Sequence, residues 1–380
     1  MNYLSENTIS NKTVLLRCDF NVPVKDNVIE DNSKIIKSLD TIKYLLDNNN
    51  KVIIFSHFGR VKTDSDKINN SLKIVFDELK KYIDVSFVED PNNIILDDSK
   101  CFLVENTRFT DLPEVRESKN DLELSKYWAS FGDVFVNDAF ASLHRAHSST
   151  AGLSKFLPTY FGFLVESELK NLDILINNTP RPFVVIMGGA KVEDKIVYIE
   201  GLCKYVDKII LTGSILNAFL KVMNYNIGKS DIDIDEVTVE RIKKVLSDYS
   251  DKICFGRKFG VLNNDKYSIK DLDLVNDIDI LYDNYVLYDA LDNCNILFMN
   301  GTCGFMKDDR FTHGTKELLE YISNLNCKKI AGGGDALSAI NRFGFNNIFD
   351  YLSSGGGATL EYVSNHKLNA LEFIKENTSK

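Results

Sequence analysis

Two lysines follow a pair of glycines near the middle of the chain, in a pattern that suits a phosphate group. The apolar run 183–187 ends at Gly188-Gly189, and a helix-compatible stretch with Lys191 and Lys195 comes next. Lysines four residues apart on a helix share one face, here near the end that offers unpaired N–H groups and a positive dipole. The P-loop pattern G-x-x-x-x-G-K-[ST] is absent from this stretch, so an ordinary strand-to-helix turn with solvated lysines remains the alternative.

Two triple-glycine turns add to the same chemistry. Gly332-Gly333-Gly334-Asp335 leads into a helix-compatible run that starts at Ala336, and Gly355-Gly356-Gly357 leads into another. They predict two further helix N-termini, one with a carboxylate suited to Mg²⁺ beside bound phosphates. Glycine-rich turns at helix ends are common, so a structural role stays possible for each one. Together with the lysine pair they favour a nucleotide-binding surface.

A different set of polar residues follows the apolar runs of the first half of the chain. These residues include the cations His57, Arg60 and Arg108, and the segments are Arg17-Cys18-Asp19-Phe20-Asn21, Ser56-His57-Phe58-Gly59-Arg60, Glu105-Asn106-Thr107-Arg108 and Asn137-Asp138. The segment 144–147 adds Arg145 between two histidines. The H-x-x-H spacing could indicate a metal, but no third ligand lies nearby in the sequence. An arginine between histidines better fits a phosphate or carboxylate, and a solvated basic turn is the alternative.

The elements that must position these residues alternate between strand-like and helical patterns. Apolar runs typical of buried strands occur at 14–16, 52–55, 85–88, 102–104 and 134–136, and then at 183–187, 209–211, 296–299, 329–330 and 348–352. Helical stretches such as 35–46 and 122–131 lie between them. The alternation predicts an α/β protein with parallel sheets. Because the carboxyl ends of parallel strands share one edge, the polar groups should gather where ligands bind.

Composition narrows the class of protein. A length of 380 residues allows two domains, and a net charge of −10 argues against general nucleic-acid binding. No apolar run reaches about 18 residues and the first residues are polar, so we expect neither a membrane span nor a signal peptide. The seven cysteines are scattered without a C-x-x-C pair, which predicts reduced thiols and a cytoplasmic protein.

The sequence resembles the phosphoglycerate kinase family over nearly its whole length. The matching segments in the first half are 17–23, 40–45, 56–60, 105–109, 136–140 and 144–149, and those in the second half are 188–196, 228–230, 300–301, 314–316, 332–335 and 355–358. The resemblance implies two Rossmann-like three-layer domains with parallel sheets, joined by a hinge helix. It places a 3-phosphoglycerate-binding domain at 1–163, with the tail 361–380 packing back on it. A nucleotide-binding domain would span 164–360, with a connecting helix at 164–178.

The resemblance also implies an activity and a set of residue roles. The family catalyses reversible phosphoryl transfer between 1,3-bisphosphoglycerate and Mg-ADP, giving 3-phosphoglycerate and Mg-ATP. We therefore expect a hinge-bending, monomeric glycolytic kinase without nucleic-acid or membrane partners. Matching positions would bind the glycerate substrate through Asp19, Phe20, Asn21, Lys34, His57, Phe58, Gly59, Arg60, Arg108 and Arg145. Lys191, Lys195, Lys34, Gly333 and Gly356 would assist transfer. The nucleotide would bind at Lys195, Gly213, Asn300, Lys307, Gly333, Gly334, Asp335 and Ala336, with Asp335 as the Mg²⁺ ligand.

Several residues depart from the family pattern, most of them on the nucleotide side. Lys34 stands where the family has an arginine, which keeps the charge but loses the planar fork. Lys307 replaces a glutamate that holds ribose hydroxyls, and Ala336 replaces a threonine. The remaining changes are Thr212-Gly213-Ser214 for three glycines, which would crowd the adenine, Thr302-Cys303 within the Asn-Gly-Pro-x-Gly loop, and Ser354 for threonine.

These departures keep a second hypothesis open, that of a non-catalytic relative which binds or scaffolds. Retention of Lys191, Lys195 and Asp335 favours the enzyme, because a protein freed from catalysis would lose these residues first. A Rossmann oxidoreductase is a third reading, and it is disfavoured because no G-x-G-x-x-G follows a strand-like run.

Overall fold

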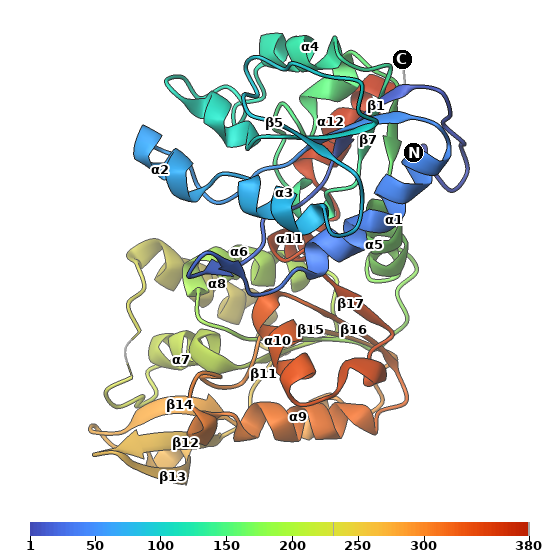
Figure 1. The fold of residues 1–380 in the computed structure, drawn as a ribbon. Helices are drawn as coiled ribbons and strands as arrows, with labels where there is room; N and C mark the ends of the chain where they lie inside the picture. The colour runs from blue at the N-terminus through green and yellow to red at the C-terminus, as the bar shows by residue number, and fades with distance from the viewer. Residues whose placement is uncertain (231, 379–380) are drawn as a thin grey trace. The chain divides into compact units, whose positions relative to one another are not determined.

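A computed structural model describes residues 1–230 and 232–378 (Figure 1). The chain forms two compact units. Unit 1 comprises residues 1–170 and the segment from Lys367 onward, and unit 2 comprises Asn171–His366. The chain leaves unit 1 within helix α5 (Phe163–Asp173) and returns to it directly after helix α11 (Gly357–Asn365).

Unit 1 is built on a six-stranded sheet in the order β5-β6-β4-β1-β7-β8. All neighbouring strands in it are parallel. The strands are β1 (Thr13–Arg17), β4 (Lys51–Phe55), β5 (Ser86–Val88), β6 (Cys101–Val104), β7 (Val134–Asn137) and β8 (Thr159–Phe161). The five strands predicted in this half are confirmed. The three-residue strand β8 was missed because so short a run carries little apolar signal.

Helices cover both faces of this sheet. Apolar residues of helix α1 (Ser33–Asp47) recur at helical spacing, and with helix α3 (Lys73–Leu79) they pack on the face that carries Val14 and Val52. Helix α4 (Leu122–Ala129) packs its Trp128 on the opposite face, against Phe55. Because neighbouring residues of a strand point to opposite faces, each buried strand serves both layers. Helix α12 (Asn369–Thr378) packs near η3 (Gly152–Lys155).

Unit 2 repeats this plan. Its sheet has the order β11-β10-β9-β15-β16-β17, again with parallel neighbours throughout. The strands are β9 (Phe183–Met187), β10 (Lys208–Leu211), β11 (Ile253–Cys254), β15 (Ile296–Asn300), β16 (Lys328–Gly332) and β17 (Tyr351–Ser353). The predicted run 348–352 is a strand only from Tyr351 onward, because the short helix η7 (Asn346–Ile348) precedes it.

Two helical layers enclose the second sheet. Helices α9 (His313–Ser323) and α10 (Gly334–Arg342) bury apolar residues on the face that carries Val184 and Leu297. Helix α6 (Val192–Leu202) packs against α11 and against α8 (Glu236–Tyr249), and helix α7 (Gly213–Val222) also contacts α6 and α8. The α/β class with two three-layer parallel-sheet units is therefore confirmed. No helix in the described ranges is both long enough and apolar enough to cross a membrane.

Unit 2 also carries a small antiparallel sheet, visible beside α7 in Figure 1, which the sequence analysis did not predict. Its order is β13-β12-β14, formed by β12 (Lys258–Asn263), β13 (Lys266–Asp271) and β14 (Ile280–Asn284). Asn264 and Asp265 both have positive φ in the turn between β12 and β13. An Asn-Asp pair between two strand-like runs favours this kind of hairpin, so the sequence contained a signal from which β12 and β13 could have been predicted.

Candidate active site

Asp19 forms the centre of a polar site at the carboxyl edge of the unit 1 sheet, directly after β1. Its Oδ2 accepts a hydrogen bond of 2.7 Å from Lys34 Nζ, and the Asp19 side chain is only 6% exposed. Asp19 Oδ1 accepts from the backbone N–H of Asn21, and Asn21 Oδ1 accepts from the backbone N–H of Gly59. Burial by itself would raise the pKa of Asp19, but the charge of Lys34 and the hydrogen bonds from Lys34 and the Asn21 backbone lower it below its ordinary value. Asp19 is therefore held as a carboxylate that fixes Lys34.

A buried arginine, Arg17, connects this site to strand β1. It was not among the site residues predicted from the sequence. Its guanidinium donates through Nε to Ser149 Oγ at 2.9 Å, and Ser149 in turn donates to the buried carboxylate of Glu117. Arg17 is the last residue of β1, so its position at a strand end was the signal that could have identified it. The side chain is fully buried and serves as internal support for the polar edge.

His57 is a neutral donor, which corrects its sequence-based grouping with the cations. Arg17 Nη2 lies 3.0 Å from His57 Nδ1. A guanidinium can only donate, so Nδ1 must accept and the ring proton belongs on Nε2. Burial, together with the charge of Arg17, lowers the pKa of His57 well below its ordinary value. His57 can therefore donate a hydrogen bond to an anion without carrying a charge of its own.

The cations around this edge repel one another, which is the electrostatic signature of an anion site. Burial, followed by the charge of Arg145, lowers the pKa of Arg108. Burial and the charges of Arg17, Arg108 and Arg145 lower the pKa of His147 to about 3. Arg108 Nε and His144 Nδ1 are buried without a hydrogen-bond partner among the described residues. Buried donors and acceptors are normally paired, so these two atoms are consistent with a ligand that completes them.

The other predicted residues of this site contribute mainly through the backbone. Phe20 and Phe58 are buried in the apolar cluster of unit 1. Their N–H groups donate to side chains that order the loops, Phe20 N to Ser56 and Phe58 N to Asn106. Arg108 donates to the carbonyl of Gly59, which fixes the loop that carries the exposed Arg60.

In unit 2, Lys195 extends across the ends of two strands. It lies in the first turns of α6, and its Nζ donates to the carbonyl of Gly188 at 2.5 Å and to Asn300 Oδ1 at 3.0 Å. Asn300 ends β15 and donates through Nδ2 to the carbonyl of Gly332 at the end of β16. Burial lowers the pKa of Lys195, and the carboxylate of Asp335 opposes that effect. The ends of three neighbouring strands are thus linked through one ammonium and one amide.

Gly189 leaves the space in which Lys195 and Asp335 converge. A methyl group built on Gly189 would lie 2.9 Å from Lys195 Nζ and 3.7 Å from Asp335 Oδ2, and φ at this residue is +101°. Asp335 lies in the first turn of α10, which begins at Gly334 with Gly333 as its N-cap. An ammonium, a carboxylate and a helix N-terminus therefore border one glycine-lined space that suits phosphate groups.

Two further helix N-termini lie at carboxyl ends of strands in unit 2. Lys191 is the N-cap of α6 and is exposed, whereas Lys195 is half-buried. Gly356 is the N-cap of α11, with φ of +56°. A methyl group on Gly334, Gly356 or Gly357 would meet no other atom within 4 Å, so these backbones are open to a ligand. The predicted helix starts after both triple-glycine turns are confirmed.

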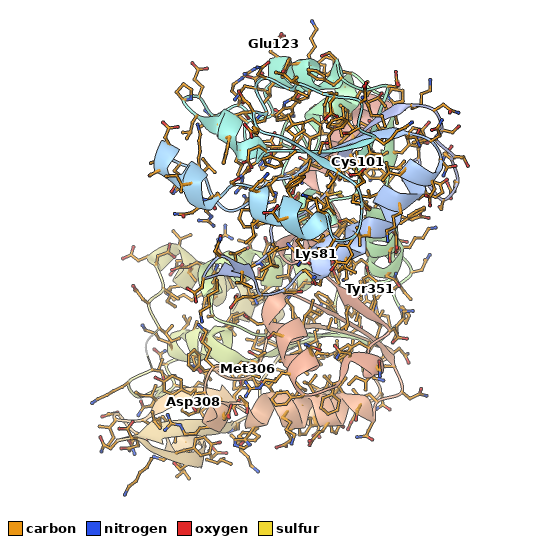
Figure 2. All side chains as sticks on the ribbon, in the orientation of Figure 1. Lys81, Cys101, Glu123, Met306, Asp308 and Tyr351 are labelled. Atoms are coloured by element: carbon orange, nitrogen blue, oxygen red, sulfur yellow. The ribbon has the colours of Figure 1, made fainter. Side chains whose placement is uncertain are left out.

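A cavity of about 670 Å³ adjoins this space. It is lined by several predicted nucleotide-site residues, namely Gly213, Lys307 and Asp335, and by residues from the small antiparallel sheet. Tyr282, Asp283 and Asn284 of β14 are the main lining residues that the sequence analysis missed, because β14 itself was not predicted. Figure 2 shows Met306, another lining residue, and Asp308 beside that small sheet.

Two of the three residues of the segment Thr212-Gly213-Ser214 line this cavity. Thr212 is fully buried and donates to the carbonyl of Thr302, so it does not line the cavity. Gly213 and Ser214 do line it, and Gly213 N donates to Asn284 Oδ1 at 2.8 Å. Of the side chains in this segment, only that of Ser214 would therefore crowd a nucleotide base bound in the cavity.

The residues present fit a magnesium ion that arrives with phosphates. No group of three or more metal-ligating side chains occurs among the described residues, and Asp335 is the carboxylate that approaches Gly189 at the edge of the cavity. Magnesium keeps several waters and is held in phosphate-transfer sites by one or two carboxylates plus the substrate phosphates. A single carboxylate beside a helix N-terminus is thus a suitable donor set for Mg²⁺ but not for a metal held by protein alone.

Comparisons with known proteins agree on one family. The phosphoglycerate kinase family model matches residues 4–366. A phosphoglycerate kinase of Staphylococcus aureus (strain JH9) is 38% identical, with 98% of each chain covered. The solved structure of phosphoglycerate kinase from Coxiella burnetii superposes with a TM-score of 0.85 at 30% identity, covering 99% of both chains. The structure of the Pyrococcus horikoshii OT3 phosphoglycerate kinase also gives 0.85, at 25% identity and 100% coverage of both chains.

Proposed function

The chain belongs to the phosphoglycerate kinase family and is a kinase of glycolysis that acts on small molecules and a nucleotide, and we propose how its two sites divide the reaction. Unit 1 holds the glycerate substrate, and unit 2 holds ADP or ATP. The phosphoryl group moves between the carboxylate oxygen of 3-phosphoglycerate and the terminal phosphate of the nucleotide. None of the comparisons favours a non-catalytic relative.

The proposed glycerate site uses charged side chains. Arg60, Arg108 and Arg145 neutralise the phosphate and carboxylate of the substrate, and His57 donates from Nε2. Asp19 and Asn21 accept and orient its hydroxyl group, while Lys34 contributes a positive charge to the reacting end. The unpaired Arg108 Nε and the repulsion among the arginines support this assignment.

The proposed nucleotide site uses backbone N–H groups and two ammonium groups. Lys195 binds the nucleotide phosphates, and Lys191 stabilises the phosphoryl group during transfer. Backbone groups at Gly333, Gly334 and Gly356 donate to the oxygens that gain charge, and Asn300 orients Lys195. Gly213, Lys307 and Ala336 border the nucleoside and phosphate. The single observation that carries this proposal is the convergence of Lys195 and Asp335 on Gly189, which together with Asp335 lines the cavity of unit 2.

The reaction requires that the two substrates are aligned and that the charge on the transferred phosphoryl group is neutralised. The attacking atom is already an oxyanion, a carboxylate oxygen in one direction and a phosphate oxygen in the other, so no general base is needed. Phosphoryl transfer proceeds through a loose transition state whose charge is spread over the equatorial oxygens, which rewards N–H donors and ammonium groups placed around it. Magnesium, held by Asp335 together with the nucleotide, would supply additional positive charge to the phosphates.

Further parts of the proposal concern the whole molecule. Transfer requires the donor in one unit to reach the acceptor in the other, so we expect the two units to close during the reaction, with the chain crossings near residues 170 and 366 as the hinge. We further propose a monomeric cytoplasmic enzyme without nucleic-acid or membrane partners, in keeping with its net charge of −10.

Substitution of Lys191 tests the proposal. The parent protein with Mg-ATP and 3-phosphoglycerate should form an acyl phosphate that hydroxylamine traps. Lys191→Ala should reduce kcat by roughly 100-fold or more, since loss of one preorganised transition-state donor costs about 3 kcal/mol. Calorimetric binding of 3-phosphoglycerate should be unchanged. Substrate binding without turnover in the parent protein would instead indicate a binding protein.

A further inference from the structure

Two cysteines lie next to each other just before neighbouring parallel strands of unit 2. Cys294 precedes β15 and Cys327 precedes β16. The register pairs Ile296 with Lys328, and Lys328 N donates to the carbonyl of Asn295 at 3.1 Å. The two chain segments therefore already run side by side where the cysteines occur. This is the amino edge of the sheet, and the candidate nucleotide site lies at the carboxyl edge of the same strands.

The two thiols interact with each other within one apolar cluster. Their side chains are hydrogen-bonded to each other, and both pack against the apolar cluster that includes Leu319 and Ile322 of α9. Cys294 is buried, whereas Cys327 is half-buried and can be reached by a small solute. Because the two backbone segments run side by side, the sulfur atoms come from neighbouring positions at one edge of the sheet.

The pair is also chemically unequal. The hydrogen bond from Cys294, with the charge of Lys329 adding to it, lowers the pKa of the Cys327 thiol. The same hydrogen bond raises the pKa of Cys294, which therefore remains the protonated partner. Thiolate character and access decide which cysteine reacts first with an oxidant, and both favour Cys327.

A second pair of cysteines provides an internal contrast. Cys18 and Cys101 lie in one apolar cluster of unit 1, but both are completely or almost completely buried. Burial raises the pKa of each of these thiols. Cys18 and Cys101 therefore lack both the access and the thiolate character that Cys327 has.

We propose that Cys294 and Cys327 form a redox pair that closes to an intrachain disulfide when the protein meets a peroxide. The Cys327 thiolate attacks one oxygen of the peroxide and the O–O bond breaks. Hydroxide leaves and takes up a proton as water, and Cys327 becomes a sulfenic acid. The Cys294 sulfur then attacks the Cys327 sulfur, and the hydroxyl group leaves as a second water with the Cys294 proton. Two thiols lose two electrons in total, and hydrogen peroxide is reduced to two waters.

The cross-link would join the start of β15 to the start of β16. At the other end of these strands, Asn300 Nδ2 donates to the carbonyl of Gly332 at 2.8 Å. Because the disulfide forms at the opposite edge, it should leave the candidate nucleotide site open. It would close the loop that contains α9, so the oxidised protein should unfold at a higher temperature than the reduced one.

Mass spectrometry of the intact, folded protein tests the proposal. The protein is treated with hydrogen peroxide under native conditions, its remaining thiols are alkylated, and its peptides are mapped. We expect two of the seven thiols to be lost, a peptide that links Cys294 to Cys327, and full recovery on reduction with dithiothreitol. Oxidation of Cys327 to sulfinic acid without a link to Cys294 would overturn the proposal, and so would a link between Cys18 and Cys101 instead.

Single substitutions separate the roles of the two sulfurs. In Cys294→Ser the resolving thiol is missing, so a sulfenic acid on Cys327 should persist and be trapped by dimedone. In Cys327→Ser the remaining Cys294 thiol should stay reduced in the presence of peroxide. Cys254→Ser is the matched control, because Cys254 is equally half-buried but directs its thiol to a backbone carbonyl, and the cross-link should form normally in it. Equal dimedone labelling of Cys327 in the parent and in Cys294→Ser would contradict the proposal.

Discussion

The two candidate sites are both suited to bind phosphates, but they consist of different chemical groups. The site in unit 1 consists of side-chain cations, and burial together with the repulsion among these cations lowers the pKa of Arg108 and His147. The site in unit 2 consists of helix N-termini, open glycines and an ammonium group held by Gly188 and Asn300. The first should therefore be sensitive to loss of charge, and the second to loss of space around the backbone.

Removal of one arginine tests the charged site, and it should have the largest effect on a KM. Arg145→Gln deletes an exposed cation beside Arg108. We expect the KM for 3-phosphoglycerate to rise roughly 30-fold, because a hydrogen bond to a charged group contributes about 2 kcal/mol. The thermal midpoint should stay the same or rise, since a repulsive charge is lost. Steady-state kinetics and a thermal melt measure both quantities.

The matched control for this substitution is Arg116→Gln. Arg116 is in the same unit but is ion-paired with Asp121 at 3.1 Å, so its loss should leave both substrate KM values unchanged. If Arg145→Gln raised the KM for nucleotide as much as that for 3-phosphoglycerate, the division of labour between the units would be wrong.

Addition of one methyl group tests the backbone site. Gly334 is the first residue of α10, and an alanine side chain there would meet no other atom within 4 Å. Gly334→Ala should fold normally, yet its methyl group would occupy the approach of a phosphate to the N–H groups. We expect the KM for ATP to rise by about tenfold, a loss of about 1.4 kcal/mol, with the KM for 3-phosphoglycerate unchanged.

Gly301→Ala provides the structural contrast. Its methyl group would lie 2.3 Å from the carbonyl of Gly188, at a residue with φ of +106°, so this variant should lose stability as well as nucleotide affinity. Comparison of the melting curves of the two variants separates blocked access from disturbed packing. A Gly334→Ala protein that binds ATP normally would show that the open backbone is not the phosphate site.

The contrast between the sites also explains what the sequence could predict. Strands such as β9 and β15 were recognisable because strands buried on both faces are continuous apolar runs, and the helix starts at Gly334 and Gly357 were marked by glycines. The sequence did not reveal that His57 is neutral, because that depends on Arg17, forty positions away. Strand β14 carries a weak apolar signal because it ends in the polar residues Asp283 and Asn284, so the wall of the cavity at Tyr282–Asn284 was missed.

Reversal of the charge at Lys307 should strengthen the binding of ATP. Lys307 lines the cavity where the family pattern has a glutamate that accepts from ribose hydroxyls. Lys307→Glu restores that acceptor, and we expect the KM for ATP to fall roughly threefold, as one additional hydrogen bond would give. Lys316→Glu makes the same change of charge on the exposed face of α9, outside this cavity, and is the control. An equal response of both variants would indicate a general effect of net charge.

The smallest expected effect concerns two buried carboxyl groups, one in each unit. Burial raises the pKa of Asp283 to about 7, although Gly314 N and Asn284 N donate to it, and burial raises the pKa of Asp138 to about 7 as well. Asp283 lines the cavity of unit 2, whereas Asp138 accepts from Leu164 N and Val165 N at the start of α5. Both groups should therefore ionise near neutral pH, but only Asp283 does so at the proposed nucleotide site.

Asp283→Asn should remove a pH dependence that Asp138→Asn leaves in place. Above pH 7 the Asp283 carboxylate would repel the nucleotide anion, so the parent KM for ATP should rise a few-fold between pH 6 and 8, and the Asp283→Asn profile should be flat. The two carboxyl groups should have the same effect on how the free energy of unfolding depends on pH. A carboxyl whose folded pKa lies above its unfolded value stabilises the protein at low pH, and this contribution is lost as the pH rises from about 4 to about 7. Each variant should therefore flatten the denaturation free energy over that window, while only Asp283→Asn changes the KM profile. An ATP profile that responds equally to both substitutions would mean that the pH effect reflects stability and has no origin in the nucleotide site.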